Sequence, residues 1–178
     1  MLRLFAAIPI DDDAAAGLTR LQTGLEPVRW SPPENFHVTL RFFGEASEII
    51  ADDIDLALAQ ISAQPFDLSL EGAGAFGEAS EPRAIWAGVA DSPALTALAK
   101  ACERAARRAG LKPETRAFRP HVTLAYLRGQ DSAAVARWIQ ASNLYRAAAP
   151  VRVSRFGLYS SHASKHGGRY QLERVYRL

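Results

Sequence analysis

Apolar residues along the chain follow two different spacings, and the two alternate. Short runs rich in β-branched and aromatic residues predict strands at 2–10, 36–43, 66–70, 84–90, 121–127, 151–160 and 170–178. Apolar residues three or four positions apart predict amphipathic helices at 11–25, 47–61, 92–109 and 131–139. Strands and helices mix without a regular strand–helix–strand order, so the pattern favours the α+β class.

Length and composition are those of an ordinary globular domain. The chain has 178 residues, of which 48% are hydrophobic and 22% charged, so it can bury a core without a metal or a disulfide. No linker or low-complexity segment divides it, and we expect a single domain over residues 1–178.

The charges are nearly balanced, with a formal net charge of +2, which does not by itself indicate a nucleic-acid binder. Only three of the 21 basic residues are lysines, and arginine offers a planar fork that suits phosphate oxygens. A GC-rich coding sequence would also enrich arginine and alanine, so the arginine content leaves both explanations open.

Cysteine usage and the first apolar run indicate the compartment. Cys102 is the only cysteine, which excludes an internal disulfide and any multi-cysteine metal site. The apolar stretch 4–10 contains Pro9 and is followed by three aspartates, so it is too short for a signal peptide or a membrane span. We therefore expect a reduced, cytoplasmic protein that does not bind membranes.

One four-residue sequence occurs twice. His-Val-Thr-Leu stands at 37–40 and again at 121–124, each time in a predicted strand. Because side chains alternate across a strand, the histidine and threonine of each copy share one face, and the valine and leucine anchor the other in the core. An internal duplication would bring the two polar faces together about a pseudo-twofold axis. We therefore expect two lobes, each an antiparallel sheet backed by helices, around a central cleft with His37, Thr39, His121 and Thr123.

Two imidazoles and two hydroxyls suit acid–base chemistry on a phosphodiester. Histidine has a reference pKa of about 6.5, so one ring can accept a proton while the other donates one near neutral pH. Threonine hydroxyls can hydrogen-bond phosphate oxygens without titrating. Two histidines without a carboxylate are too few ligands for a metal ion, so we expect no metal. Two ordinary strand histidines are the simpler alternative, and the identical second copy argues against it.

The chain resembles the 2H phosphoesterases, and among them the bacterial and archaeal RNA 2′,3′-cyclic phosphodiesterases once described as 2′-5′ RNA ligases. The resemblance runs nearly from end to end. It rests on the two motifs with their flanks, at 35–45 and 118–125, and on similar stretches at 3–9, Trp30, 82–89, 156–161 and 168–170.

This resemblance implies a hydrolase without metal or cofactor that acts on RNA ending in a 2′,3′-cyclic phosphate and leaves a 2′-phosphomonoester. It implies that His121 is the general base that activates water and His37 the general acid that protonates the departing 3′-oxygen. Thr39 and Thr123 would hold the phosphate oxygens. The residues alone do not assign the two histidine roles, because the repeat is symmetric.

Three further residues are candidate substrate contacts. Arg41 is two positions beyond Thr39 on the same strand face, so period-two spacing points it toward the cleft. Tyr126 stands where relatives often carry an arginine, and Arg128 follows two positions later and can take that place. The sequence indicates RNA or related nucleotides as the partner and no obligate protein partner.

Other motifs have plainer explanations. Residues 72–77 match G-x-G-x-x-G, but a strand follows instead of a helix, so we expect a glycine-rich loop that borders the cleft, not a dinucleotide site. His162 and His166 lie among serines and glycines, which favours an exposed loop. We expect the three tryptophans to lie in the core, Cys102 to be inert, and a helix C-terminus to be stabilised by Arg104, Arg107 and Arg108.

Alternative functions stay open at this point. A related enzyme could act on a small cyclic nucleotide, or join RNA ends through a 2′-5′ bond by the reverse reaction. A nucleotide- or RNA-binding module could keep the cleft without the chemistry, although two intact copies of the motif argue against this.

Overall fold

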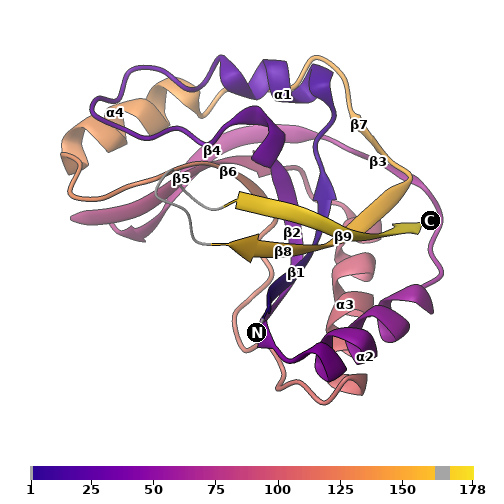
Figure 1. Cartoon of the computed structure of the whole chain (residues 1–178). Helices are drawn as coiled ribbons and strands as arrows, with labels where there is room; N and C mark the ends of the chain where they lie inside the picture. The colour runs from indigo at the N-terminus through magenta and orange to yellow at the C-terminus, as the bar shows by residue number, and fades with distance from the viewer. Residues whose placement is uncertain (1, 163–168) are drawn as a thin grey trace.

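The computed structural model describes residues 2–162 and 169–178, and an antiparallel sheet lies at its centre (Figure 1). The seven strands of this sheet lie in the order β4-β5-β6-β2-β1-β8-β9, and β3 pairs with β7 in a separate small sheet. The strands are β1 (Leu2–Pro9), β2 (His37–Ala46), β3 (Phe66–Leu68), β4 (Leu70–Glu78), β5 (Glu81–Val89), β6 (His121–Tyr126), β7 (Val151–Val153), β8 (Arg155–His162) and β9 (Arg169–Arg177). The helices are α1 (Asp12–Thr19), α2 (Glu48–Ala59), α3 (Pro93–Arg108) and α4 (Ser132–Ser142), with a short 3-10 helix η1 (Pro33–Asn35).

The large sheet consists of two halves that meet between β2 and β6. These two strands pair at one position, Val38 with Val122, whereas strands within each half pair over most of their length. α2 and α3 pack on the half that contains β1 and β2, and α4 packs on β4 and β5. The predicted α+β fold with two antiparallel halves is confirmed, and the halves join into one sheet.

Two helices cross from one half of the sheet to the other. α1 follows β1 along the chain, yet it lies on the same side of the molecule as α4 (Figure 1). The loop after α1 is fixed there because the indole N–H of Trp138 donates to the carbonyl of Leu21 at 3.0 Å. α3 follows β5 and packs on β2 of the other half. Each half thus receives a helix that follows a strand of the other half, as two copies of a β–α–β–α unit would give. We therefore propose that the single bilobal domain arose by duplication.

The helices begin where the sequence predicts. Each begins after a residue whose side chain accepts a hydrogen bond from a backbone N–H of the first turn, as N-caps do; these residues are Asp11, Ser47, Ser92 and Asp131. None of the described helices is long and apolar enough to cross a membrane.

The prediction that the first helix continues through Leu25 is wrong. After Thr19 the chain tightens into turns, with the N–H of Leu21 bonded to the carbonyl of Leu18 at 3.0 Å. Leu25 is nevertheless buried, and it reaches the core from a loop. Leu25 is therefore spaced like the next residue of the helix because it packs in the same core as Leu18, although the helix has already ended.

The prediction of a glycine-rich loop at 72–77 is also wrong, because this segment is the centre of β4. β4 pairs with β5, and Gly74 lies opposite Trp86. A Cβ on Gly74 would collide with the indole ring of Trp86, so glycine is needed where the large side chain lies over the strand. Packing therefore accounts for a composition that is typical of loops.

Two predicted strands are each divided between the two sheets. The chain passes from β3 to β4 at Ser69, and from β7 to β8 at Ser154.

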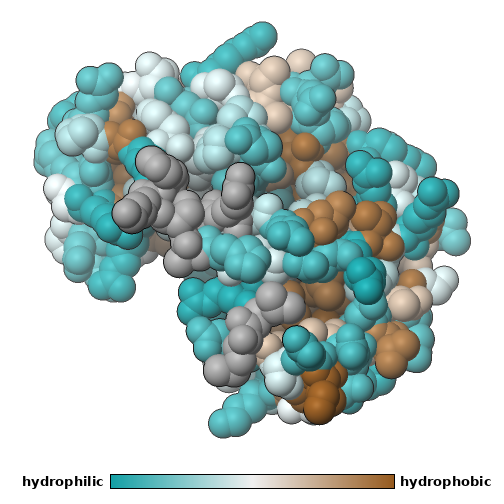
Figure 2. All heavy atoms as spheres, in the orientation of Figure 1, coloured by the Kyte–Doolittle hydropathy of each residue, from teal (hydrophilic) through white to brown (hydrophobic). Residues whose placement is uncertain are grey.

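The surface of the face shown in Figure 2 is mostly hydrophilic, with separate hydrophobic patches. Leu172 and Val175 of the edge strand β9 contribute exposed apolar surface, with 49% and 48% of their area accessible.

Val38 and Val122 are fully buried at the junction of the two halves. We expect Val38→Ala and Val122→Ala each to lower the free energy of unfolding by about 1–3 kcal/mol, because each substitution leaves a small cavity. Since the two side chains are cross-strand partners, the double variant should lose less than the sum of the single losses, by about 0.5 kcal/mol or more. Urea unfolding of the four proteins measures this coupling.

Val153→Ala is the matched control, because Val153 is equally buried but lies in the small sheet. Its effect should add to that of Val38→Ala within about 0.5 kcal/mol. Strict additivity of Val38→Ala and Val122→Ala would contradict a junction carried by these two side chains.

Candidate active site

A cleft of about 1160 Å³ opens over the line where β2 and β6 meet. The structure brings His37, Thr39, His121 and Thr123 together on its lining, while the valine and leucine of each motif are buried behind them. Because Val38 is opposite Val122 in an antiparallel pair, Thr39 is opposite His121 and His37 is opposite Thr123. Each histidine thus stands beside the threonine of the other motif.

Both histidines are held by the same local hydrogen bond. The Nδ1 atom of His37 lies 2.7 Å from the carbonyl oxygen of Asn35, and the Nδ1 atom of His121 lies 2.7 Å from that of Arg119. A carbonyl can only accept, so Nδ1 carries the proton in both rings. The Nε2 atom of each ring is consequently free to accept a proton when the ring is neutral and to donate one when it is charged.

Aromatic rings surround each histidine. Phe5 and Tyr170 lie 5.0 Å and 5.2 Å from the His37 ring, measured between centroids. Phe76 and Trp86 lie 4.7 Å and 6.2 Å from the His121 ring. The two imidazoles therefore stand in matching apolar walls on either side of the junction between β2 and β6.

These walls change the acidity of the imidazoles. Burial lowers the pKa of His37 to about 4, against a partial rise from the Asn35 carbonyl and a further lowering by His121. Burial also lowers the pKa of His121, and the Arg119 carbonyl opposes this. Since desolvation disfavours the charged imidazole, both rings are neutral at pH 7 in the ligand-free protein. An anionic ligand between them would raise both pKa values.

Two tyrosines from opposite halves of the sheet meet at the cleft. Tyr126 of β6 and Tyr170 of β9 both line it, and Tyr126 is 61% exposed. Burial raises the pKa of Tyr170, as do the charge and the hydrogen bond of the Tyr126 side chain. Tyr170 therefore stays neutral, and its ring covers His37 edge-on.

Arg41 lines the cleft, but its guanidinium is already engaged. Nε lies 2.5 Å from a carboxylate oxygen of Glu103, and one terminal nitrogen donates to the carbonyl of Lys112 at 2.8 Å. The other terminal nitrogen lies 3.8 Å from Glu114 and donates to the carbonyl of Phe42.

Glu114 in turn binds Arg116, whose hydrogen bond lowers the pKa of the Glu114 carboxyl to about 2. Arg41 thus fixes the segment 112–116 that leads into the second motif.

The other predicted contacts have different surroundings. Arg128 is not among the residues that line the cleft, and its backbone N–H donates to the side chain of Gln130. Arg116 and Arg119 do line the cleft, and sequence reasoning missed both. The signal for Arg119 was present, because it stands two positions before His121, in the same period-two register as Thr123.

His162 lies at the end of β8 and not in a loop, which corrects the prediction for this residue, while His166 is outside the described residues. It is exposed at the rim of the cleft, and its Nε2 atom lies 3.1 Å from the hydroxyl of Ser160. That hydroxyl donates to Glu173 at 2.5 Å, so the serine is not oriented as a nucleophile. Over residues 2–162 and 169–178, no three histidine, cysteine, aspartate or glutamate side chains cluster as metal ligands would.

A sequence profile of the 2′-5′ RNA ligase superfamily matches residues 9–165. This chain belongs to the 2′-5′ RNA ligase superfamily. A similar protein, named RNA 2′,3′-cyclic phosphodiesterase, comes from Aeropyrum pernix. It is 41% identical over 104 residues, which are 58% of this chain and 59% of that protein. The protein of that name from Archaeoglobus fulgidus is 33% identical over 126 residues, 69% of this chain and 71% of its own length.

Solved structures agree with the superfamily assignment. E. coli LigT complexed with 3′-AMP superposes with a TM-score of 0.81 and 26% identity, covering 99% of this chain and 98% of the other. TT0787 of Thermus thermophilus gives a TM-score of 0.77 at 26% identity, covering 99% and 97%. The fold and the family that the two motifs suggested are confirmed.

The lowered pKa values of both histidines predict the pH dependence of catalysis. If one ring must be charged and the other neutral, kcat/KM follows a bell whose limbs report the free protein. Both pKa values lie below 6.5, so the required charge is progressively lost above that pH. We expect kcat/KM to peak below pH 6.5 and to fall about tenfold per pH unit on the alkaline limb.

Tyr170→Ala is the diagnostic variant for this profile. Removing the ring that covers His37 admits water, so the pKa of His37 should rise and the maximum should move to higher pH. A maximum of kcat/KM at or above pH 7.5 in the unaltered protein would contradict two desolvated histidines.

Proposed function

We propose that the protein hydrolyses the 2′,3′-cyclic phosphodiester at the end of an RNA and leaves a 2′-phosphomonoester. The observation that carries the proposal is a pair of imidazoles in one cleft with two threonine hydroxyls, in which backbone carbonyls hold Nδ1 and so leave Nε2 as the nitrogen that can exchange a proton. The names of the relatives support the substrate class. We also propose a cytoplasmic location, which suits the free, buried Cys102.

In the proposed reaction the phosphorus atom lies between the two rings. Thr39 and Thr123 donate hydrogen bonds to its non-bridging oxygens. His121 Nε2 takes a proton from water as the water oxygen bonds to phosphorus, and His37 Nε2 gives its proton to the 3′-oxygen as the P–O3′ bond breaks. The resemblance to relatives assigns these two roles, since the hydrogen bonds of the two rings are alike.

The negative charge of the substrate would promote the protonation of a histidine that is neutral in the free protein. A general acid must carry a proton, yet burial keeps His37 neutral at pH 7 in the empty cleft. The anionic phosphodiester, once bound, favours the imidazolium by direct attraction. Substrate binding therefore protonates one ring, and the cleft is charged for catalysis only when it is occupied.

Both arginines that we propose as substrate contacts line the cleft, and one of them, Arg116, is also paired with Glu114. We propose that Arg119 and Arg116 at the cleft lining meet the RNA backbone and that Tyr126 lies against the bound nucleotide. Arg41 would act as a positioning residue, because it holds 112–116 and thereby the backbone that supplies the Arg119 carbonyl to His121.

Replacing either histidine should remove the chemistry and spare binding. We expect His37→Ala and His121→Ala each to lower kcat about 100-fold or more on an oligonucleotide with a 2′,3′-cyclic phosphate end, measured in EDTA. The double variant should lose much less than the product of the two factors, because the rings act as one relay. Chromatography of the product identifies the 2′-phosphate.

His162→Ala is the matched control, as this exposed histidine at the rim has no part in the proposed relay. It should keep kcat within about 3-fold of the unaltered protein. Loss of all activity in EDTA with recovery on adding a divalent ion, or a 3′-phosphate product, would overturn the proposed reaction.

Arg41 can be tested against its own ion-pair partner. If Arg41 positions 112–116, Arg41→Ala and Glu103→Gln should both lower kcat, by about tenfold, with KM little changed and with partial rescue by Arg41→Lys. If Arg41 instead bound RNA, Glu103→Gln would release its guanidinium and lower KM. The kinetics of the three variants separate the two roles.

Few phosphates should be neutralised when RNA binds. With Arg116 and Arg119 at the cleft, we expect log affinity to fall with log salt at a slope of about −0.7 to −2, as for one to three contacts with single-stranded RNA. Arg119→Ala should flatten the slope, whereas Arg107→Ala at the exposed end of α3 should not. A steeper slope, or a larger effect of Arg107→Ala, would place the RNA on the helical surface.

A further inference from the structure

The cleft extends past the two motifs as far as α3. Beyond Thr39 the strand β2 no longer pairs with β6, because these strands meet only at Val38 and Val122. The opening between them is lined by 40–42 of β2, by residues of the segment 114–118, and by Thr96, Ala99, Lys100 and Glu103 of α3. We call this part of the cleft the α3 arm. The proposed reaction at the two histidines leaves its purpose unexplained.

All the charged side chains of the α3 arm are paired with one another except one. Arg41 lies 2.5 Å from Glu103, and Glu114 is shared between Arg41 and Arg116. Lys100 is exposed, and it has no ion-pair partner among residues 2–162 and 169–178. The two arginines balance the two carboxylates, so Lys100 gives the arm one unbalanced positive charge. A lysine ammonium binds phosphate oxygens as a point charge.

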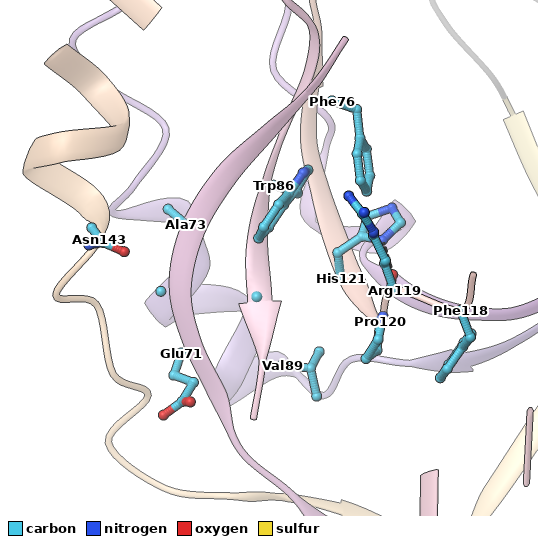
Figure 3. A pocket seen from close by; sticks show the side chains of 12 residues that line it. Glu71, Ala73, Phe76, Trp86, Val89, Phe118, Arg119, Pro120, His121 and Asn143 are labelled. Carbon is cyan, nitrogen blue, oxygen red and sulfur yellow. Dashed lines mark hydrogen bonds between the residues drawn. The ribbon is translucent and has the colours of Figure 1, made fainter. Parts of the chain in front are cut away.

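The proposed reaction determines the side of the phosphorus atom on which the RNA lies. O2′ and O3′ belong to one ribose, and His37 gives its proton to O3′, so this ribose lies on the His37 side. Water attacks from the His121 side, where a smaller cavity of about 470 Å³ opens; Figure 3 shows Phe76, Arg119 and His121 at its lining. The rest of the RNA continues from the 5′-carbon of the same ribose. It therefore leaves the cleft from the His37 side.

The two ends of the cleft offer this RNA different exits. At the end of β6, the side chains of Tyr126 and Tyr170 are hydrogen-bonded to each other across the cleft, and the RNA would have to break this bond to pass. At the other end, Phe42 is 40% exposed and stacks on Phe5, with ring centroids 5.7 Å apart. The ring of Phe5 also lies 5.0 Å from that of His37. An aromatic row thus leads from His37 into the α3 arm, which is open.

We propose that the α3 arm holds the RNA strand that precedes the terminal nucleotide, and that Lys100 binds the phosphate between the last two nucleotides. Thr96 lies one helical turn before Lys100, so its hydroxyl can donate to the same phosphate. The inference rests on the proposed function, which places the terminal ribose at His37. Because a cyclic mononucleotide lacks this phosphate, Lys100 is a specificity residue that favours RNA over small cyclic nucleotides.

A dinucleotide substrate tests this contact by the removal of a single charge. The substrate is ApA with a 2′,3′-cyclic phosphate end, and its two nucleosides are joined by a natural phosphodiester or by an uncharged methylphosphonate. We expect the unaltered protein to favour the charged linkage by about tenfold in kcat/KM. Lys100→Gln should bring this ratio to within about twofold of one, whereas Lys100→Arg should keep most of it.

Arg104→Gln is the matched control for the loss of a charge from α3. Arg104 lies one helical turn after Lys100 and is exposed, but it does not line the cleft. This variant should leave the ratio of the two linkages unchanged. A ratio that persists in Lys100→Gln overturns the proposal. So does a ratio that falls equally in Lys100→Gln and Arg104→Gln, because the effect would then come from the overall charge of the helix and not from a contact in the cleft.

Binding of the open product separates this phosphate contact from the proposed hydrolysis. Titration calorimetry with ApA 2′-phosphate, made with each of the two linkages, measures the same ratio without turnover. If neither cyclic substrate is hydrolysed but the charged product binds about tenfold more tightly, and Lys100→Gln removes the difference, the proposed function fails and the contact at Lys100 stands. If both cyclic substrates are hydrolysed with equal kcat/KM, the contact at Lys100 fails and the proposed function stands.

Discussion

The site depends on the pairing of β2 with β6 through Val38 and Val122. Both valines are fully buried, and strand alternation then forces the histidine and threonine of both motifs onto the opposite face. A slip of one residue in either strand would bury one histidine and expose one valine, which the core strongly disfavours. Hydrophobic packing on the opposite face of the sheet therefore sets the relative position of the two imidazoles. α1 and α3, which cross between the halves, keep the two halves together.

The same packing sets the acidity of the imidazoles. Four aromatic rings reduce the contact of the two imidazoles with water and so favour the neutral forms; they are Phe5, Tyr170, Phe76 and Trp86. The carbonyls of Asn35 and Arg119 oppose this by stabilising a charged ring, but burial is the larger effect at both histidines. The binding of an anion raises the pKa of a desolvated imidazole more than that of a solvated one, because water screens the Coulomb attraction less there.

What the sequence predicted was local, and what it missed was tertiary. N-caps act within one turn and strand alternation within two residues, so the helix starts and the polar face of each motif were predictable from a few neighbouring letters. The strand β4 was missed because glycine is needed at Gly74 to make room for the indole ring of Trp86, which lies on the neighbouring strand. The pairing of Arg41 with Glu103 joins residues 62 positions apart, and nothing near Arg41 in the sequence indicates it. Likewise, no short-range pattern places Tyr170 of the last strand over His37 of the second.

The two copies of the repeated motif stand in different surroundings, although their own geometry is the same. The internal hydrogen bonds of the copies are alike, with Nδ1 of each ring 2.7 Å from a carbonyl two residues upstream. The surroundings differ, because Tyr170 closes over His37, whereas a cavity opens beside His121. The two sides of the cleft therefore differ, although the hydrogen bonds that hold the two rings are alike. This difference comes from β4, β5 and β9 and not from the motifs themselves.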